Sequence, residues 1–191
     1  MDPVKDSDGR IILLNGVSSA GKTSIAKALQ AQLDEPYLHV CIDSFEDMMP
    51  AQREAEGPFA WRPIFSNMLS GFHHSIRALA ECGNNLIVNH VLVEGEEPET
   101  WLSECLQLIE PYKVFFVGVH CPIEELDRRE ISRGDRPKGL ARWQFDRMHR
   151  QVVYDFEVDT SVCSPQECAN LIQAALSASP TTGLSSTLKL H

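Results

Sequence analysis

The sequence predicts an α/β protein with three layers, in which a five-stranded parallel sheet lies between two layers of helices. Three observations lead to this fold class. Short apolar runs alternate with longer segments of helical periodicity along nearly the whole chain. A glycine-containing loop joins the first apolar run directly to the first helical segment. The length of 191 residues, with 43% hydrophobic and 23% charged residues, suits one globular domain with a sizeable core.

The five predicted strands are apolar runs bounded by turn residues or helical segments. Residues 113–120 give the clearest case, because a continuous apolar run is typical of a parallel strand buried on both faces. The predicted strands cover residues 11–15, 37–42, 85–90, 113–120 and 154–159. Ligands of such sheets bind at the carboxyl ends of the strands. Asp43, Asn89, His90 and His120 are therefore predicted to share one edge.

The predicted helices repeat apolar residues at spacings of three and four. Residues 64–82 carry such a face from Met68 to Leu79, and Gly83 and Asn84 supply the usual stop. The predicted helices cover residues 24–33, 64–82, 100–109, 123–132, 140–152 and 165–178. They give one domain over residues 1–178, followed by a Ser- and Thr-rich tail, residues 179–191, that is predicted to be mobile.

Residues 45–63 fit no long element, because Pro50, Gly57, Pro58 and Pro63 interrupt it. The same stretch is too rich in Met and aromatic residues for a bare linker. Two interpretations remain open. It is either a loop that covers the substrate, with room for one helical turn, or a surface excursion packed on the core.

The composition disfavours several kinds of partner. A formal net charge of −10 and a pI of about 5.1 argue against binding to nucleic acid or to an anionic membrane surface. The six cysteines form no C-x-x-C pair and are typical of reduced, buried thiols in a cytosolic protein. No apolar signal region or segment of transmembrane length is present, so a cytoplasmic location is expected. The oligomeric state is left open.

The strongest functional signal is the loop of residues 16–23, which fits the phosphate-loop pattern G-x-x-x-x-G-K-[ST]. Gly16 and Gly21 permit a tight turn that points successive backbone N–H groups at a polyphosphate, next to the positive end of a helix. Lys22 reaches the outer phosphates, and the Thr23 hydroxyl is the predicted ligand of Mg²⁺. A chance glycine turn that holds a lysine is the alternative; the flanking strand and helix favour a nucleoside triphosphate site. The predicted contacts are Gly16, Ser18, Ser19, Ala20, Gly21, Lys22, Thr23 and Ser24.

Asp43 follows the second predicted strand and should lie on the same edge as Lys22. In a phosphoryl transferase, a carboxylate at this place accepts the proton of the acceptor hydroxyl and aims its oxygen at the γ-phosphate. Asp43 and the adjacent Ser44 are thus predicted to meet the substrate. The alternative is that Asp43 only caps the turn that follows.

A cluster of basic residues interrupts an otherwise acidic chain: Arg128, Arg129, Arg133, Arg136 and Lys138. Such clusters are often solvated helix faces, and the acidic neighbours of this one keep that interpretation open. The break at Gly134 favours a hinged lid over about residues 128–142. Arg133 and Arg136 would then neutralise charge that develops during phosphoryl transfer. Arg129, near the start of the lid, is predicted to stack on adenine.

Four motifs together resemble the chloramphenicol phosphotransferase family: the loop of residues 15–23, Ile42-Asp43-Ser44, the segment of residues 133–136, and residues 154–160. The resemblance runs from about Arg10 to about Ala178. It implies a P-loop kinase fold, ATP and Mg²⁺ as cofactors, and phosphorylation of a primary hydroxyl on the antibiotic. It also implies that Asp43 is the general base, that Lys22 and Thr23 hold the triphosphate and Mg²⁺, and that Arg133 and Arg136 are lid arginines.

One departure from the family pattern affects the metal. The family typically has acidic residues at the end of the third strand, where this chain has Asn89 and His90. The Mg²⁺ ion would then rest on Thr23, the phosphates and water, with or without Asp43. His90 either contacts the substrate or is a hydrogen-bonded histidine at a strand end.

The sequence therefore predicts an ATP-dependent kinase that phosphorylates a hydroxyl of a small molecule, chloramphenicol or a related antibiotic among them. Two alternatives remain. One is a toxin-type kinase that acts on a nucleotide sugar. The other is a nucleotide-binding regulatory protein that has lost catalysis, which the pair Asn89-His90 would favour.

Overall fold

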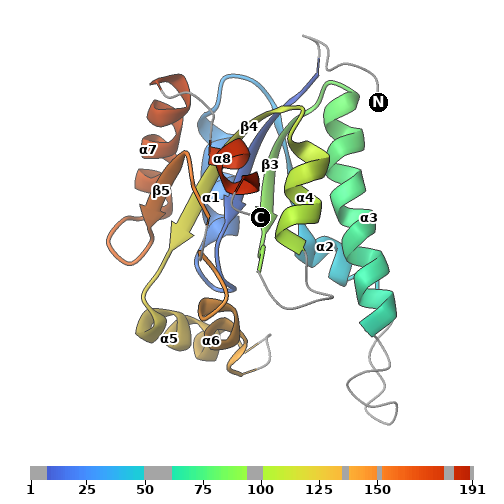
Figure 1. The fold of residues 1–191 in the computed structure, drawn as a ribbon. Coiled ribbons are helices and arrows are strands. Elements are labelled where there is room, and N and C mark those ends of the chain that lie inside the picture. Colours follow the sequence, from blue (N-terminus) through green and yellow to red (C-terminus); the bar gives the residue numbers. More distant parts are fainter. Residues whose placement is uncertain are drawn as a thin grey trace.

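Five parallel strands lie side by side in the order β2-β3-β1-β4-β5 (Figure 1). They are β1 (Arg10–Asn15), β2 (Tyr37–Cys41), β3 (Asn85–His90), β4 (Lys113–His120) and β5 (Phe156–Asp159). The structure is a computed structural model that describes residues 8–49, 62–93, 101–134, 138–149, 152–178 and 183–189. Asn15, the last residue of β1, pairs with His90, the last residue of β3, and with Gly118, so β1 and β3 end level and β4 continues to His120. The predicted parallel sheet of five strands is confirmed.

Helices cover both faces of this sheet, and two more lie beyond its carboxyl edge (Figure 1). One face carries α3 (Arg62–Glu81), α4 (Trp101–Ile109) and α8 (Gly183–Leu188), and the other carries α1 (Lys22–Gln32) and α7 (Pro165–Ala178). The short helix α2 (Ile42–Glu46) follows β2. The helices α5 (Ile123–Arg133) and α6 (Leu140–Phe145) lie next to each other at the carboxyl edge.

The alternation of side chains along the strands produces two separate cores. In β1, Ile11 and Leu13 pack under α3 and α4, whereas Ile12 and Leu14 pack under α1 and α7. All four side chains are almost completely buried. The sheet is therefore fixed from both faces, and its carboxyl edge provides a rigid base for the site.

Three predicted boundaries are wrong for identifiable reasons. The second strand ends at Cys41, so Asp43 lies in the first turn of a helix rather than at the end of a strand. The predicted helix of residues 140–152 stops at Phe145; the backbone of His149 has a φ of 62°, which no α-helix accepts. The last strand begins at Phe156 instead of residue 154, because the Asp155 carboxylate accepts the N–H of Phe116 at 2.8 Å.

The predicted mobile tail contains an ordered helix, α8. Leu184 belongs to the core on the α3 side, with 5% of its surface exposed. Thr187 is fully buried; its hydroxyl accepts the N–H of Val153 at 2.8 Å and donates to the oxygen of Val153 at 3.0 Å. The prediction failed because a short Ser- and Thr-rich stretch shows little apolar periodicity of its own.

Most of the segment of residues 45–63 lies outside the described residues, so the two interpretations of it both stand. None of the six cysteines forms a disulfide, and three are buried, but Cys82 is exposed, which the sequence did not predict. Within the part of the chain that the structure describes, no helix combines the length and the apolar character that a membrane span requires.

Candidate active site

A cavity of about 1280 Å³ opens at the carboxyl ends of the strands. This volume exceeds that of a typical single-ligand pocket, so a nucleotide and a small acceptor fit together. The predicted site residues that line it are Ser18, Ser19, Gly21, Lys22, Thr23, Ser24, Asp43, His90, Arg129 and Arg133. The structure thus brings together residues from the phosphate loop, α2, β3 and α5. Gly16 and Ala20 are buried behind the loop, and Arg136 lies outside the described residues.

The phosphate loop is tightly packed against the sheet. A Cβ atom at Gly16 would lie 2.5 Å from the carbonyl oxygen of Val119, so only glycine fits there. Gly21 has a φ of 93°, which glycine accepts without strain. The Lys22 ammonium donates to the carbonyl oxygens of Gly16 at 2.7 Å and Val17 at 2.9 Å. The lysine is thereby folded over the loop, where a polyphosphate would compete for its protons.

The start of α1 and the end of β3 meet at Thr23. The Asn89 side-chain N–H donates to the Thr23 hydroxyl at 3.1 Å. The other end of this amide, Oδ1, is buried and has no hydrogen-bond partner among the described residues. A buried acceptor without a partner is costly unless a ligand or water satisfies it. A hydroxyl and an amide oxygen side by side match the oxygen ligands and bound waters that Mg²⁺ prefers.

Asp43 faces the cavity from the first turn of α2, where a negative charge is favoured by the helix dipole. Glu46 of the same helix and Asp47, which follows its end, also line the cavity. Ser44 does not; it is exposed and lies outside the cavity lining, which disagrees with its predicted contact to the substrate.

The basic residues of the cavity come from other elements. Lys22 belongs to α1, and Arg128, Arg129 and Arg133 belong to α5. The cations that line the cavity thus come from α1 and α5, whereas Asp43 and Glu46 come from α2. We call Lys22 with the α5 arginines the donor half, and α2 with the apolar side chains Phe65, Leu69 and Trp101 the acceptor half. An anionic donor is attracted to the first half.

Helices α5 and α6 are joined by several contacts across the break at Gly134. The buried carboxylate of Glu130 accepts the N–H of Gly139 at 2.7 Å and the N–H of Ala141 at 2.9 Å. Arg142 of α6 pairs with Asp127 of α5 at 2.5 Å. The start of α6 is thus held by α5, although the predicted lid segment between them is described only in part.

Arg129 is fixed between α5 and the strand-end loop after β5. Its guanidinium donates to the hydroxyl of Thr160 at 2.9 Å and to the carbonyl oxygen of Thr160 at 2.8 Å, and its Nε donates to Glu125 at 2.7 Å. The Thr160 hydroxyl in turn donates to the oxygen of Ala20 in the phosphate loop at 2.8 Å. Arg129 therefore stands beside the phosphate loop; its predicted stacking on adenine stays a prediction.

His90 forms hydrogen bonds through both ring nitrogens. Its Nδ1 accepts the N–H of Val91 at 2.8 Å, so the proton lies on Nε2 and is shared with Nε2 of His73 at 2.7 Å. Burial lowers the pKa of His73 to about 4. Burial also lowers the pKa of His90, with smaller effects from His73 and Lys22. Both rings are therefore neutral, and the geometry agrees with the hydrogen-bonded strand-end histidine rather than with a substrate contact.

The sulfur of Cys105 lies within 4.8 Å of these nitrogens, a grouping that resembles a metal site. However, two nitrogens bound to one tetrahedral zinc ion stand about 3.3 Å apart, farther than the 2.7 Å between His73 and His90. The N–H of Val91 also occupies the second nitrogen of His90. The group is thus a buried hydrogen-bonded pair.

An apolar wall, formed by side chains of α3 and α4, lines the acceptor half of the cavity. Phe65 of α3 and Trp101 of α4 pack with ring centroids 5.6 Å apart, and both line the cavity with Leu69 and Val91. Sequence reasoning placed Leu69 only on a helix face and gave Phe65 no role beyond its place in the predicted helix. No local signal marks them, because their role depends on how α3 and α4 lie over the sheet.

Gln144 and Glu130 were also missed. Gln144 lines the cavity and its Oε1 accepts the N–H of Ser18 at 2.7 Å. Glu130 seemed one of several surface acids of a charged helix, yet only 4% of it is exposed. In both cases the function follows from a tertiary contact that sequence periodicity does not contain.

Three comparisons with known proteins agree with this geometry. The sequence model of the family described as "Chloramphenicol phosphotransferase-like protein" matches residues 9–177. The chain is 34% identical over 195 aligned positions to the proteins named "Putative O-phosphotransferase Rv2636" and "Putative O-phosphotransferase MT2714" from two strains of Mycobacterium tuberculosis. The alignment covers 91% of this chain and 84% of each relative.

Several solved structures with similar folds are described as kinases. One is the APS kinase CysC of Mycobacterium tuberculosis in complex with AMPPNP and APS, which superimposes with a TM-score of 0.66 at 19% identity. The superposition covers 93% of this chain and 100% of the CysC chain. Shikimate kinase of Acinetobacter baumannii gives a TM-score of 0.59 at 14% identity, covering 87% of this chain and 93% of its own. At these identities the likeness shows the fold alone.

Proposed function

The chain belongs to the chloramphenicol phosphotransferase-like family of P-loop O-phosphotransferases, and on this basis we propose that it transfers the γ-phosphoryl group of ATP to a hydroxyl of a small molecule. The observation that carries the proposal is that Lys22 of α1 and Asp43 of α2 line one cavity. A phosphate-binding cation and a general base in one cavity are two groups that in-line transfer requires.

The donor half supplies the charge that transfer needs. Lys22 exchanges its two carbonyl partners for phosphate oxygens, and the N–H groups at the start of α1 bind the inner phosphates. Arg133, with Arg136 as its predicted companion, neutralises charge on the transferred group. Thr23 and the unpaired oxygen of Asn89 would hold Mg²⁺ and its water shell, and the ion would neutralise the phosphate oxygens.

The acceptor half binds and activates the hydroxyl. Asp43 accepts the hydroxyl proton while the oxygen attacks the terminal phosphorus, and the bond from that phosphorus to the bridging oxygen breaks. The wall of Phe65, Leu69 and Trp101 favours an acceptor with an apolar or aromatic body. Chloramphenicol, an uncharged aromatic alcohol, fits this combination, and it is the first acceptor to test.

The deciding experiment incubates the protein with γ-labelled ATP, Mg²⁺ and a panel that contains chloramphenicol, other hydroxylated antibiotics and nucleotide sugars. Mass spectrometry then identifies the phosphorylated product. Phosphate on an antibiotic supports the proposal. Phosphate on a nucleotide sugar selects the toxin-type kinase instead, and binding of ATP with no transfer to any acceptor selects the regulatory alternative.

The role of Asp43 is tested by Asp43→Asn. We expect turnover to fall by about 100-fold or more while ATP affinity is retained, since a general base typically contributes that much. Asp34→Asn, the same change at an exposed position after α1, is the matched control. Turnover that survives in Asp43→Asn would assign the base elsewhere.

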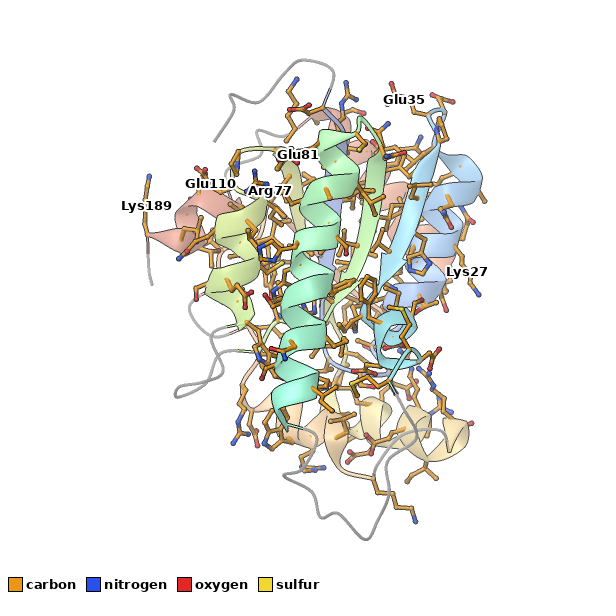
Figure 2. All side chains as sticks on the ribbon, turned by 90° about the vertical axis from the view of Figure 1, so that its right-hand side faces the viewer. Lys27, Glu35, Arg77, Glu81, Glu110 and Lys189 are labelled. Carbon is orange, nitrogen blue, oxygen red and sulfur yellow. The ribbon has the colours of Figure 1, made fainter. Side chains whose placement is uncertain are left out.

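The role of Lys22 is tested by Lys22→Ala, which should weaken ATP binding at least about 10-fold, since a charged hydrogen-bond donor is lost. Lys27→Ala is the matched control on the same helix; Lys27 points outward from α1, away from the sheet (Figure 2). Unchanged ATP affinity in Lys22→Ala would overturn the assignment of the donor half.

A further inference from the structure

Gln144 connects α6 to the phosphate loop. Its Oε1 accepts the backbone N–H of Ser18 at 2.7 Å, a short hydrogen bond between residues 126 positions apart. Only 8% of Gln144 is exposed, and the residue lines the cavity. Ser18 is the third residue of the loop, in the part that follows β1 and precedes α1. Gln144 therefore contacts the loop on its β1 side.

This hydrogen bond fixes which way the carboxamide points. Because an N–H group can only be accepted by the oxygen, the NH₂ group must be the opposite end of the amide. That NH₂ group donates to no acceptor among the described residues. A nearly buried amide therefore presents two unused donors at a cavity that is predicted to receive an anion.

The position of Gln144 is determined by contacts independent of any ligand. Glu130 binds the N–H groups of Gly139 and Ala141, which sets the start of α6 against α5. Gln144 follows within the same short helix, and Trp143, Gln144 and Leu140 all line the cavity. The amide is thus held in place before a nucleotide binds, as an effective anion contact requires.

We propose that Gln144 is a contact residue for the terminal phosphate: its oxygen holds Ser18, and its NH₂ group donates to the γ-phosphoryl oxygens. The inner phosphates have their own donors at the start of α1, from Gly21 onward. Gln144 contacts the β1 side of the loop, at Ser18, so the phosphate that it reaches is the outermost one. The residue would thereby make the site selective for a triphosphate over a diphosphate. This inference rests on the proposed function.

Two variants distinguish the role of the Gln144 side-chain oxygen from that of its NH₂ group. Gln144→Glu keeps an oxygen to accept the N–H of Ser18 but removes the donors and adds a negative charge. Gln144→Met has a similar size and removes both functions without a charge. Gln107→Glu, at an exposed position of α4, is the control for the added charge.

The measurement is the affinity of each variant for AMPPNP and for ADP, by calorimetry with Mg²⁺, and it needs no acceptor. We expect both Gln144 variants to lose about 10- to 100-fold in AMPPNP affinity, the range for a hydrogen bond to a charged group. ADP affinity should change less than about 3-fold in Gln144→Met, so the preference for the triphosphate disappears. Gln107→Glu should match the wild type for both nucleotides.

Three results would overturn the inference while the proposed function stands. Equal losses for AMPPNP and ADP would mean that Gln144 only shapes the loop. Unchanged affinities would mean that it contacts no phosphate. Tighter AMPPNP binding by Gln144→Met would mean that the glutamine blocks the Ser18 N–H. In contrast, a wild-type protein that binds neither nucleotide would refute the proposed function itself.

Discussion

The side chain of Asn89 at the end of β3 donates a hydrogen bond of 3.1 Å to the hydroxyl of Thr23 in the first turn of α1. This contact ties the phosphate loop to the central sheet at the place where Mg²⁺ would bind. It uses one end of the amide and leaves the other, a buried oxygen, without a partner among the described residues. A neutral amide thus occupies a place where a carboxylate would bind the cation more strongly.

Asn89→Asp should lower the Mg²⁺ concentration at half-maximal nucleotide binding, because a carboxylate replaces a neutral oxygen. Without Mg²⁺ the same variant should be less stable, since a buried charge would lack a counter-charge. Thermal unfolding with and without Mg²⁺ and ADP measures both effects. Asn170→Asp, on the exposed side of α7, should show neither change. A Mg²⁺ dependence equal to that of the wild type would show that the position does not face the ion.

Two glycine substitutions should have opposite effects. In Gly16→Ala the new Cβ would lie 2.5 Å from the Val119 oxygen, so the loop must shift and nucleotide affinity should fall. In Gly71→Ala nothing lies within 4 Å of the new Cβ in the interior of α3, so the free energy of unfolding should rise by about 0.5–1 kcal/mol. Urea unfolding and calorimetry measure the two quantities. Full ATP binding by Gly16→Ala would contradict the tight packing of the loop.

The pair His73–His90 should make stability depend on pH. In the folded state the pKa of His73 is about 4, below its usual value of 6.5, and that of His90 is also lowered. The unfolded chain therefore binds more protons below pH 6.5, and stability falls as the pH decreases from 6.5 toward 4. His73 alone should cost about 2 kcal/mol at pH 5 relative to pH 7.5.

Urea unfolding at pH 7.5 and pH 5 measures this loss. His73→Gln should reduce the difference between the two pH values, whatever its effect on absolute stability. His74→Gln, at the exposed neighbouring position, should change the difference far less, because His74 has the smallest of the effects that shift the pKa of His73. An undiminished difference in His73→Gln would assign the pH dependence to other groups.

Thr187→Val should destabilise the protein by about 1–3 kcal/mol, because the N–H and oxygen of Val153 both lose a buried partner. For a chain of this size each kcal/mol shifts the Tm by about 2–4 °C. Ser185→Ala, which removes an exposed hydroxyl of the same helix, should leave the Tm unchanged. An unaltered Tm in Thr187→Val would show that the two hydrogen bonds to Val153 do not stabilise the fold.

The sequence was sufficient to predict the sheet and the position of the phosphate loop. Both depend on local patterns: buried runs such as residues 113–120 produce strands, and the spacing of Gly16, Gly21 and Lys22 defines the loop. The helix α8 and the short α6 could not be derived in this way. Their limits depend on tertiary hydrogen bonds to Val153 and on the backbone of His149.

The acceptor half was predicted least well for the same physical reason. Phe65 and Trp101 come from two helices, α3 and α4, that meet only in the folded state. Asp43 was identified because it follows a strand closely, and the structure confirms that it faces the cavity even though it lies in a helix. Residues near strand ends are accessible to sequence reasoning, whereas residues on helices that cover the site are not.

The carboxylate of Glu130 binds both Gly139 and Ala141, so the two sides of the α5–α6 connection are held together by more than the chain that links them. The geometry of α6 therefore does not depend on the length of that link. Changes in the length of that link should leave Gln144 in place against Ser18.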